Sequence, residues 1–66
     1  MKKVSIQLKI NDIGMGWLAG RAFIGAKEKS RLFIVEGKTK ESIEEIMKKQ
    51  ISEFAEINPE LIIFTY

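Results

Sequence analysis

Only one segment of the sequence has the unambiguous spacing of an amphipathic helix, and this limits how much sheet surface the chain can cover. Its apolar side chains recur at intervals of three or four positions, at Ile43, Ile46, Met47, Ile51 and Phe54. Glutamates lie four residues before lysines on the opposite, polar side, where such pairs favour a helix. We therefore predict one helix with a single apolar stripe.

Both ends of this segment carry residues that are typical of helix boundaries. Thr39 can cap the N-terminus, and Glu41 lies in the first turn, where the helix dipole favours a negative charge. At the other end, Asn58 tolerates the left-handed conformation of a C-cap, and Pro59 cannot continue the hydrogen-bond ladder. The helix is thus expected to run from Thr39 to Asn58.

The other apolar segments are typical of strands. Residues 3–11 alternate strictly, with apolar side chains at every even position from Val4 to Ile10. Residues 31–37 and 60–66 are apolar on both faces. Asp12 and the glycines that follow it predict a turn after the first strand.

Residues 16–26 fit two interpretations. Read as a helix, they place Leu18, Ala22 and Phe23 on one stripe, but Gly20 and Gly25 in the interior each cost about 1 kcal/mol relative to alanine. Read as a strand, they pair with residues 31–37 through a polar loop at residues 27–30, and their small side chains let a helix approach closely. We favour the strand.

The favoured interpretation gives an α+β fold in the order β-β-β-α-β. It consists of a small, mainly antiparallel sheet of four strands with one amphipathic helix packed on one face. The helical interpretation of residues 16–26 gives the alternative βαβαβ. We expect residues 1–66 to form a single domain, because the chain is too short for two.

One helix covers one face of a sheet, so apolar strand residues remain on the other face. We expect the helix to cover Val4, Ile6, Leu8, Leu18, Ala22, Ile24, Leu32 and Ile34. The residues then left on the open face are Trp17, Phe23, Phe33 and Val35. Large exposed apolar patches are rare on monomers and usually mark a partner surface.

Composition argues against most enzyme chemistry. The sequence has no histidine and no cysteine, so its four serines lack the usual activating base and no disulfide can form. The segment GMGWLAG lacks the spacing of a nucleotide-binding loop, and most carboxylates fall on the polar side of the helix. We expect a non-enzyme with no catalytic residue, cofactor or metal site, in the cytoplasm.

These features predict an interaction module that forms a homodimer or binds a protein partner, as a regulator or inhibitor would. A core this small rarely supplies more than about 3–5 kcal/mol, and without disulfides or zinc the remaining way to add stability is oligomerisation. We expect the binding residues on the open face or a strand edge to be Trp17, Arg21, Phe23, Phe33 and Val35. Trp and Arg are enriched among residues that dominate interfaces.

Nucleic-acid binding is the alternative. Residues 1–40 carry a net charge of +6 and residues 41–66 a net charge of −4, so positive charge is concentrated in the first part of the chain. Aromatic and basic side chains on an open sheet can stack on bases and bind phosphates. The residues predicted for this role are Lys3, Lys9, Arg21, Phe23, Lys27, Lys29 and Arg31.

Overall fold

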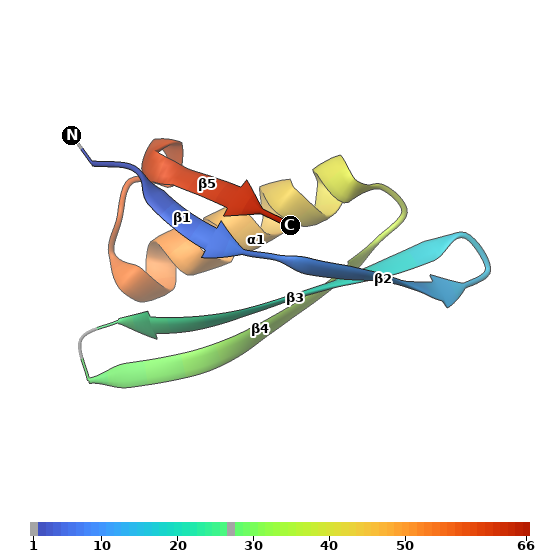
Figure 1. Ribbon diagram of the computed structural model, residues 1–66, viewed down its shortest axis with the longest axis horizontal. Helices are drawn as coiled ribbons and strands as arrows, with labels where there is room; N and C mark the ends of the chain where they lie inside the picture. The colour runs from blue at the N-terminus through green and yellow to red at the C-terminus, as the bar shows by residue number, and fades with distance from the viewer. Residues whose placement is uncertain (1, 27) are drawn as a thin grey trace.

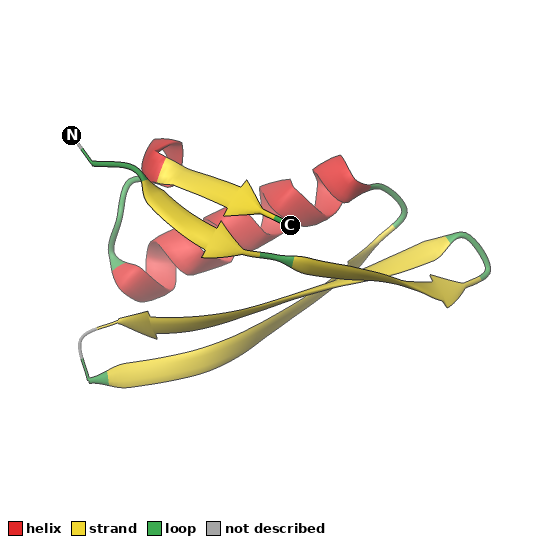
Figure 2. Cartoon of the chain, viewed as in Figure 1, coloured by secondary structure: helices red, strands yellow, loops and turns green. Residues whose placement is uncertain are grey.

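The computed structural model describes residues 2–26 and 28–66, and this part of the chain forms five strands, one α-helix and one 3₁₀-helix (Figure 1). In chain order the elements are β1 (Val4–Gln7), β2 (Lys9–Gly14), β3 (Trp17–Ala26), β4 (Lys29–Gly37), α1 (Lys40–Ala55), η1 (Pro59–Leu61) and β5 (Ile62–Thr65). Figure 2 shows strands before and after the single α-helix, which confirms the α+β class. The βαβαβ alternative is wrong, because β3 is a strand.

The first predicted strand is two strands, because the chain changes its pairing partner at Leu8. Before this residue, β1 pairs in parallel with β5, and Val4 lies opposite Ile62. After it, β2 pairs antiparallel with β3, and β3 pairs antiparallel with β4. The N–H of Leu8 donates to the carbonyl oxygen of Thr65 at 2.8 Å, so the ladder with β5 ends where β2 begins. A parallel pair and a three-stranded antiparallel sheet therefore replace the predicted four-stranded sheet.

The turn between β2 and β3 is built from residues that adopt left-handed conformations. Gly14, Met15 and Gly16 have φ angles of 98°, 57° and 79°. The N–H of Gly14 donates to Oδ1 of Asp12 at 2.8 Å. The predicted turn is thus confirmed, and it closes with a shift of register between Asp12 and Gly14.

The loop between β3 and β4 is shorter than predicted. Lys29 and Ser30, which the sequence assigns to the loop, are the first residues of β4, and Lys29 lies opposite Ala26. Lys27, the first residue of the predicted loop, lies outside the described residues. The hairpin of β3 and β4 is consequently the longest paired element of the fold (Figure 1).

The N-terminus of α1 matches the prediction. Thr39 is the N-cap, and its Oγ1 accepts a hydrogen bond from the N–H of Ser42 at 3.1 Å. Glu41 lies in the first turn. A side-chain cap of this kind satisfies one of the N–H groups that the first helical turn leaves without a backbone partner.

The C-terminus of α1 differs from the prediction. The helix ends before Glu56, which adopts the left-handed conformation with a φ of 55°, so the assignment of the C-cap to Asn58 is wrong. The reversal at Glu56 returns Ile57 to the edge of the core. The carbonyl oxygen of Ile57 accepts from the hydroxyl of Ser52 at 2.6 Å. Asn58 instead caps η1, where its side chain accepts from the N–H of Glu60 at 2.9 Å.

The core lies between α1 and one face of the strands. Its buried apolar residues are Ile6, Leu8, Ala22, Ile24, Phe33, Val35, Ile43, Met47, Ile51 and Ile62. The even positions of the first predicted strand all face this core, as the alternation indicates. Ile46 does not, since it is largely exposed and lies off the buried stripe of α1. Phe54 packs edge-on against Phe33, with ring centroids 5.4 Å apart.

The orientation of β4 is opposite to the expectation. Phe33 and Val35 point toward α1 and are 2% and 6% exposed, whereas Leu32 and Ile34 point away from it. The register explains this outcome, because Phe33 lies opposite the buried Ala22 and opposed residues of an antiparallel pair point to the same face.

Candidate functional site

The face of β3 and β4 that points away from α1, here called the outer face, carries a patch of exposed apolar side chains. Phe23 is 70% exposed, and Leu32, directly opposite it on β4, is 52% exposed. Ile34, the next outward residue of β4, is 58% exposed and lies opposite Arg21. These neighbours form one cross-strand cluster, and Trp17 extends the outer face toward the β2–β3 turn.

Three of the five residues predicted to bind a partner lie on this surface. Trp17, Arg21 and Phe23 are all exposed there. Phe33 and Val35 belong to the core and are almost completely buried, so they cannot form part of this surface. Leu32 and Ile34, which the prediction assigned to the core, occupy the outward positions instead.

Charged and polar groups surround the apolar cluster. Lys9 on β2 lies opposite Arg21, so two cationic side chains share the outer face. When the side-chain amide of Asn11 is oriented with its oxygen toward Arg21, this oxygen accepts a hydrogen bond from Nη2 of Arg21 at 2.9 Å. The ammonium of Lys38 lies 5.3 Å from the centroid of the Trp17 ring, close enough for a cation–π contact. The cluster thus has the polar rim typical of an interface.

Three of the residues predicted to bind nucleic acid come together. Lys9, Arg21 and Phe23 are all exposed on the same face of neighbouring strands. Phe23 lies two residues after Arg21 on β3, and strand geometry places two such residues on one side. This arrangement combines an exposed ring with two positive charges.

The other predicted nucleic-acid residues lie elsewhere. Lys29 and Arg31 are at the start of β4, and the Arg31 guanidinium lies 5.0 Å from the centroid of the Phe33 ring, on the side of the core. Lys3 precedes β1, which pairs with β5 rather than with β3. Lys27 is outside the described residues. The basic residues therefore do not form one continuous surface with Phe23.

Neither a metal-ligand cluster nor a membrane-spanning helix occurs in the part of the chain that the structure describes. Within residues 2–26 and 28–66, no group of three or more acidic side chains is placed to hold a metal ion. None of the helices in this part of the chain has the length and apolar character needed to span a membrane. Comparison with known proteins found no matching family model, no matching curated protein and no matching solved structure.

Proposed function

We propose that this protein is a non-enzymatic interaction module that self-associates through the outer face of its sheet. The observation that carries this proposal is the cluster of Phe23, Leu32 and Ile34, each more than half exposed and each next to another. Single exposed apolar residues are ordinary, but a contiguous group of large ones on one face of a sheet is the usual sign of a partner surface.

A second copy of the chain is a suitable partner for this surface. Two sheets can pack face to face with their apolar side chains interdigitated. Arg21 and Glu36 both point outward from the sheet, so a two-fold axis would let each Arg21 meet the Glu36 of the other copy. An interface of about 800 Å² per partner would take about one sixth of the 4909 Å² surface of the chain.

Dimer formation would also offset the weakness of a small core. A domain of about 60 residues buries only about 60% of the surface that its unfolded chain exposes. Burying Phe23, Leu32 and Ile34 against a second copy adds apolar contacts that the helix cannot supply, because α1 packs on the opposite face.

Sedimentation equilibrium over the micromolar range tests the proposal. We expect a mass of twice 7.6 kDa that falls toward the monomer value on dilution. The double variant Phe23→Ser with Ile34→Ser should shift the equilibrium to monomer, since it removes the two most exposed members of the cluster. Ile46→Ser is the matched control, because it removes an exposed isoleucine from α1.

A monomer at all concentrations would refute self-association through this face. An equal loss of dimer in Ile46→Ser would show that the effect comes from general surface hydrophobicity or from stability rather than from the outer face. Circular dichroism of each variant checks that the fold is retained.

We propose nucleic-acid binding as the second candidate, supported by the position of Phe23 beside Lys9 and Arg21. An exposed ring can stack on a base while cations contact the flanking phosphates. Electrophoretic retardation of a labelled single-stranded oligonucleotide at low salt, with loss as salt is raised, would support this function. Absence of retardation at low salt excludes nucleic-acid binding. The apolar dimer is distinguished from it because the dimer persists at high salt.

A further inference from the structure

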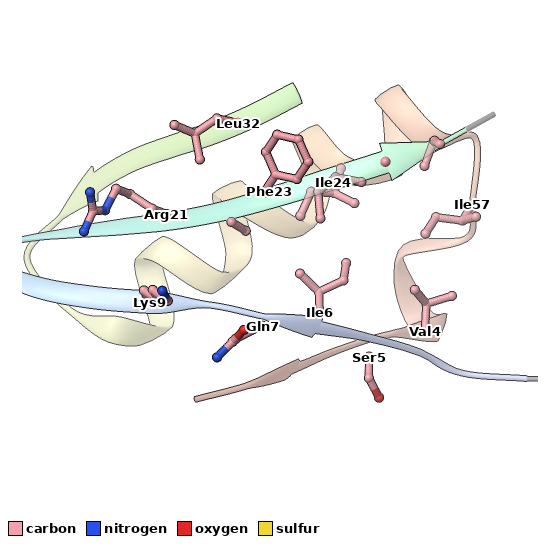
Figure 3. Close-up of a pocket in the computed structure, with 15 residues that line it drawn as sticks. Val4, Ser5, Ile6, Gln7, Lys9, Arg21, Phe23, Ile24, Leu32 and Ile57 are labelled. Atoms are coloured by element: carbon pink, nitrogen blue, oxygen red, sulfur yellow. The ribbon is translucent and has the colours of Figure 1, made fainter. Parts of the chain in front are cut away.

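A groove of about 690 Å³ separates β1 from the C-terminal half of β3 (Figure 3). Ile6 of β1 and Ile24 of β3 line its two sides, and Ile51 and Ala55 of α1 contribute to its floor. In Figure 3 the Ile6 side chain points from β1 into the space between the strands. β2 pairs with β3 as far as Arg21, and beyond this point the backbones of β1 and β3 diverge toward the other end of the hairpin (Figure 1).

Both strands that border the groove have an edge without a strand neighbour. β3 pairs with β2 as far as Arg21, whereas its pairing with β4 continues to Ala26. Within the described sheets, residues 22–26 are therefore paired on one side only, and β1 is paired only with β5. Such edges present N–H and C=O groups that can pair with an added strand.

The charge of the groove is positive. Lys9 and Arg21 line its narrow end, where they lie opposite each other, and none of the described residues that line it is acidic. The inward positions beside it are apolar, as at Ile6 and Ile24. The groove thus combines an apolar floor, two strand edges and two cations at one end.

We propose that this groove binds an extended segment of a partner protein in which apolar and acidic residues alternate. The segment would add as a strand between β1 and β3, with apolar side chains toward α1 and carboxylates toward Lys9 and Arg21. A lipid tail would fill the apolar floor but would leave both strand edges without hydrogen-bond partners.

The occupant is a different protein rather than a second copy of this chain. The alternating segment of this chain, residues 3–10, carries lysines where the groove calls for carboxylates. The exposed edge strand β4 begins with Lys29 and Arg31. Six of the nine acidic residues lie from residue 41 onward, and none of these six is within a strand. The groove shares Lys9, Arg21, Phe23 and Leu32 with the outer face, so peptide binding is measured at protein concentrations at which the chain is monomeric.

The test uses the peptide acetyl-Val-Glu-Val-Glu-Val-Glu-amide and the full chain. We expect saturable binding by fluorescence polarisation, and slower amide hydrogen exchange at alternate residues within 4–7 and 22–26 when the peptide is bound. A block isomer, with the three valines before the three glutamates, should bind more weakly because it cannot place its valines inward and its carboxylates outward. Binding without slower exchange at these two edges would overturn strand addition.

Charge reversal gives the second arm. Lys9→Glu combined with Arg21→Glu should weaken binding of the acidic peptide by about tenfold, and should favour a peptide in which lysines replace the three glutamates. Both side chains are exposed and opposite each other, so the reversal replaces one like-charged pair by another and spares the fold. Lys38→Glu with Lys40→Glu, at two exposed positions beside the N-terminus of α1 and outside the groove, changes the net charge equally and should leave binding intact. Equal losses in both double variants would overturn the assignment of the groove.

Discussion

The close approach of α1 to β3 at Gly20 gives a quantitative prediction about stability. A Cβ atom at Gly20 would lie 2.5 Å from Cγ2 of Ile43 and 3.3 Å from Cδ1 of Leu8. Ordinary contact begins at about 3.4 Å, so Ile43 would have to move by about 0.9 Å. Ile43 is fully buried and cannot do so without disturbing its neighbours. Gly20→Ala is therefore expected to destabilise the protein.

Gly25 on the same strand is the matched control. A Cβ atom at Gly25 would have no neighbour within 4 Å. Alanine in a strand is favoured over glycine by about 0.5–1 kcal/mol, because the unfolded chain loses less conformational entropy on folding. This gain applies to both substitutions and cancels in their comparison. The free energies of unfolding should thus differ by the cost of overpacking, about 1–3 kcal/mol, with Gly20→Ala the less stable.

Urea unfolding followed by circular dichroism measures this difference, with all variants at one protein concentration. Each kcal/mol should correspond to about 4–8 °C in the midpoint of thermal unfolding. Ile43→Leu, which removes the branch at Cβ, should reduce the cost of Gly20→Ala in a double-mutant cycle. Equal stability of Gly20→Ala and Gly25→Ala would refute the close packing of α1 on β3.

Three further predictions test other parts of the structure. Thr39→Ala should lower the free energy of unfolding by about 0.5–2 kcal/mol in urea titrations, and Thr39→Ser should retain it, because only the alanine loses the bond to the Ser42 N–H; equal stability would contradict the cap. Met15→Asn should raise the free energy of unfolding by up to about 1 kcal/mol, and with it the thermal midpoint, because Met15 is exposed and left-handed and asparagine adopts this conformation more readily. An unchanged midpoint would argue against that turn conformation. Phe33→Ala should lower the free energy of unfolding by about 3–5 kcal/mol, because it removes a core side chain. Phe23→Ala should lower it by no more than about 0.5 kcal/mol in the monomer at low protein concentration. The reverse order would overturn the orientation of the hairpin.

Most of the features that depend on local sequence are predicted correctly. The N-cap at Thr39, the buried stripe at Ile43, Met47 and Ile51, and the inward even positions from Val4 to Ile10 all follow from spacing alone. The structure also assigns a packing role to one small residue of β3, since Gly20 lies against Ile43. For the cap, the helix stripe and the first strand, the deciding interactions join residues near one another in the chain, or the face is marked by a clear period.

Features that depend on distant partners are not predicted. The change of partner at Leu8 requires β5, which lies more than fifty residues later and binds the Leu8 N–H through Thr65. Nothing in the alternation of residues 3–11 marks this point. The groove beside β1 depends on that change, so no local feature of the sequence marks it. The early end of α1 likewise reflects the return of Ile57 to the core rather than the identity of Asn58.

The orientation of β4 is different, because it can be deduced from the parity of the hairpin. Residues that oppose each other in an antiparallel pair point to one face, and a connection with an even number of residues places even positions opposite odd ones. The predicted loop at residues 27–30 and the observed pairing of Ala26 with Lys29 both satisfy this condition. With Ala22 inward, either arrangement puts Phe33 in the core and Leu32 outside. The apolar residues of β4 hide this result because they are continuous and have no period of their own. A one-residue insertion in the loop should therefore exchange the buried and exposed residues of β4, unless a β-bulge absorbs the extra residue.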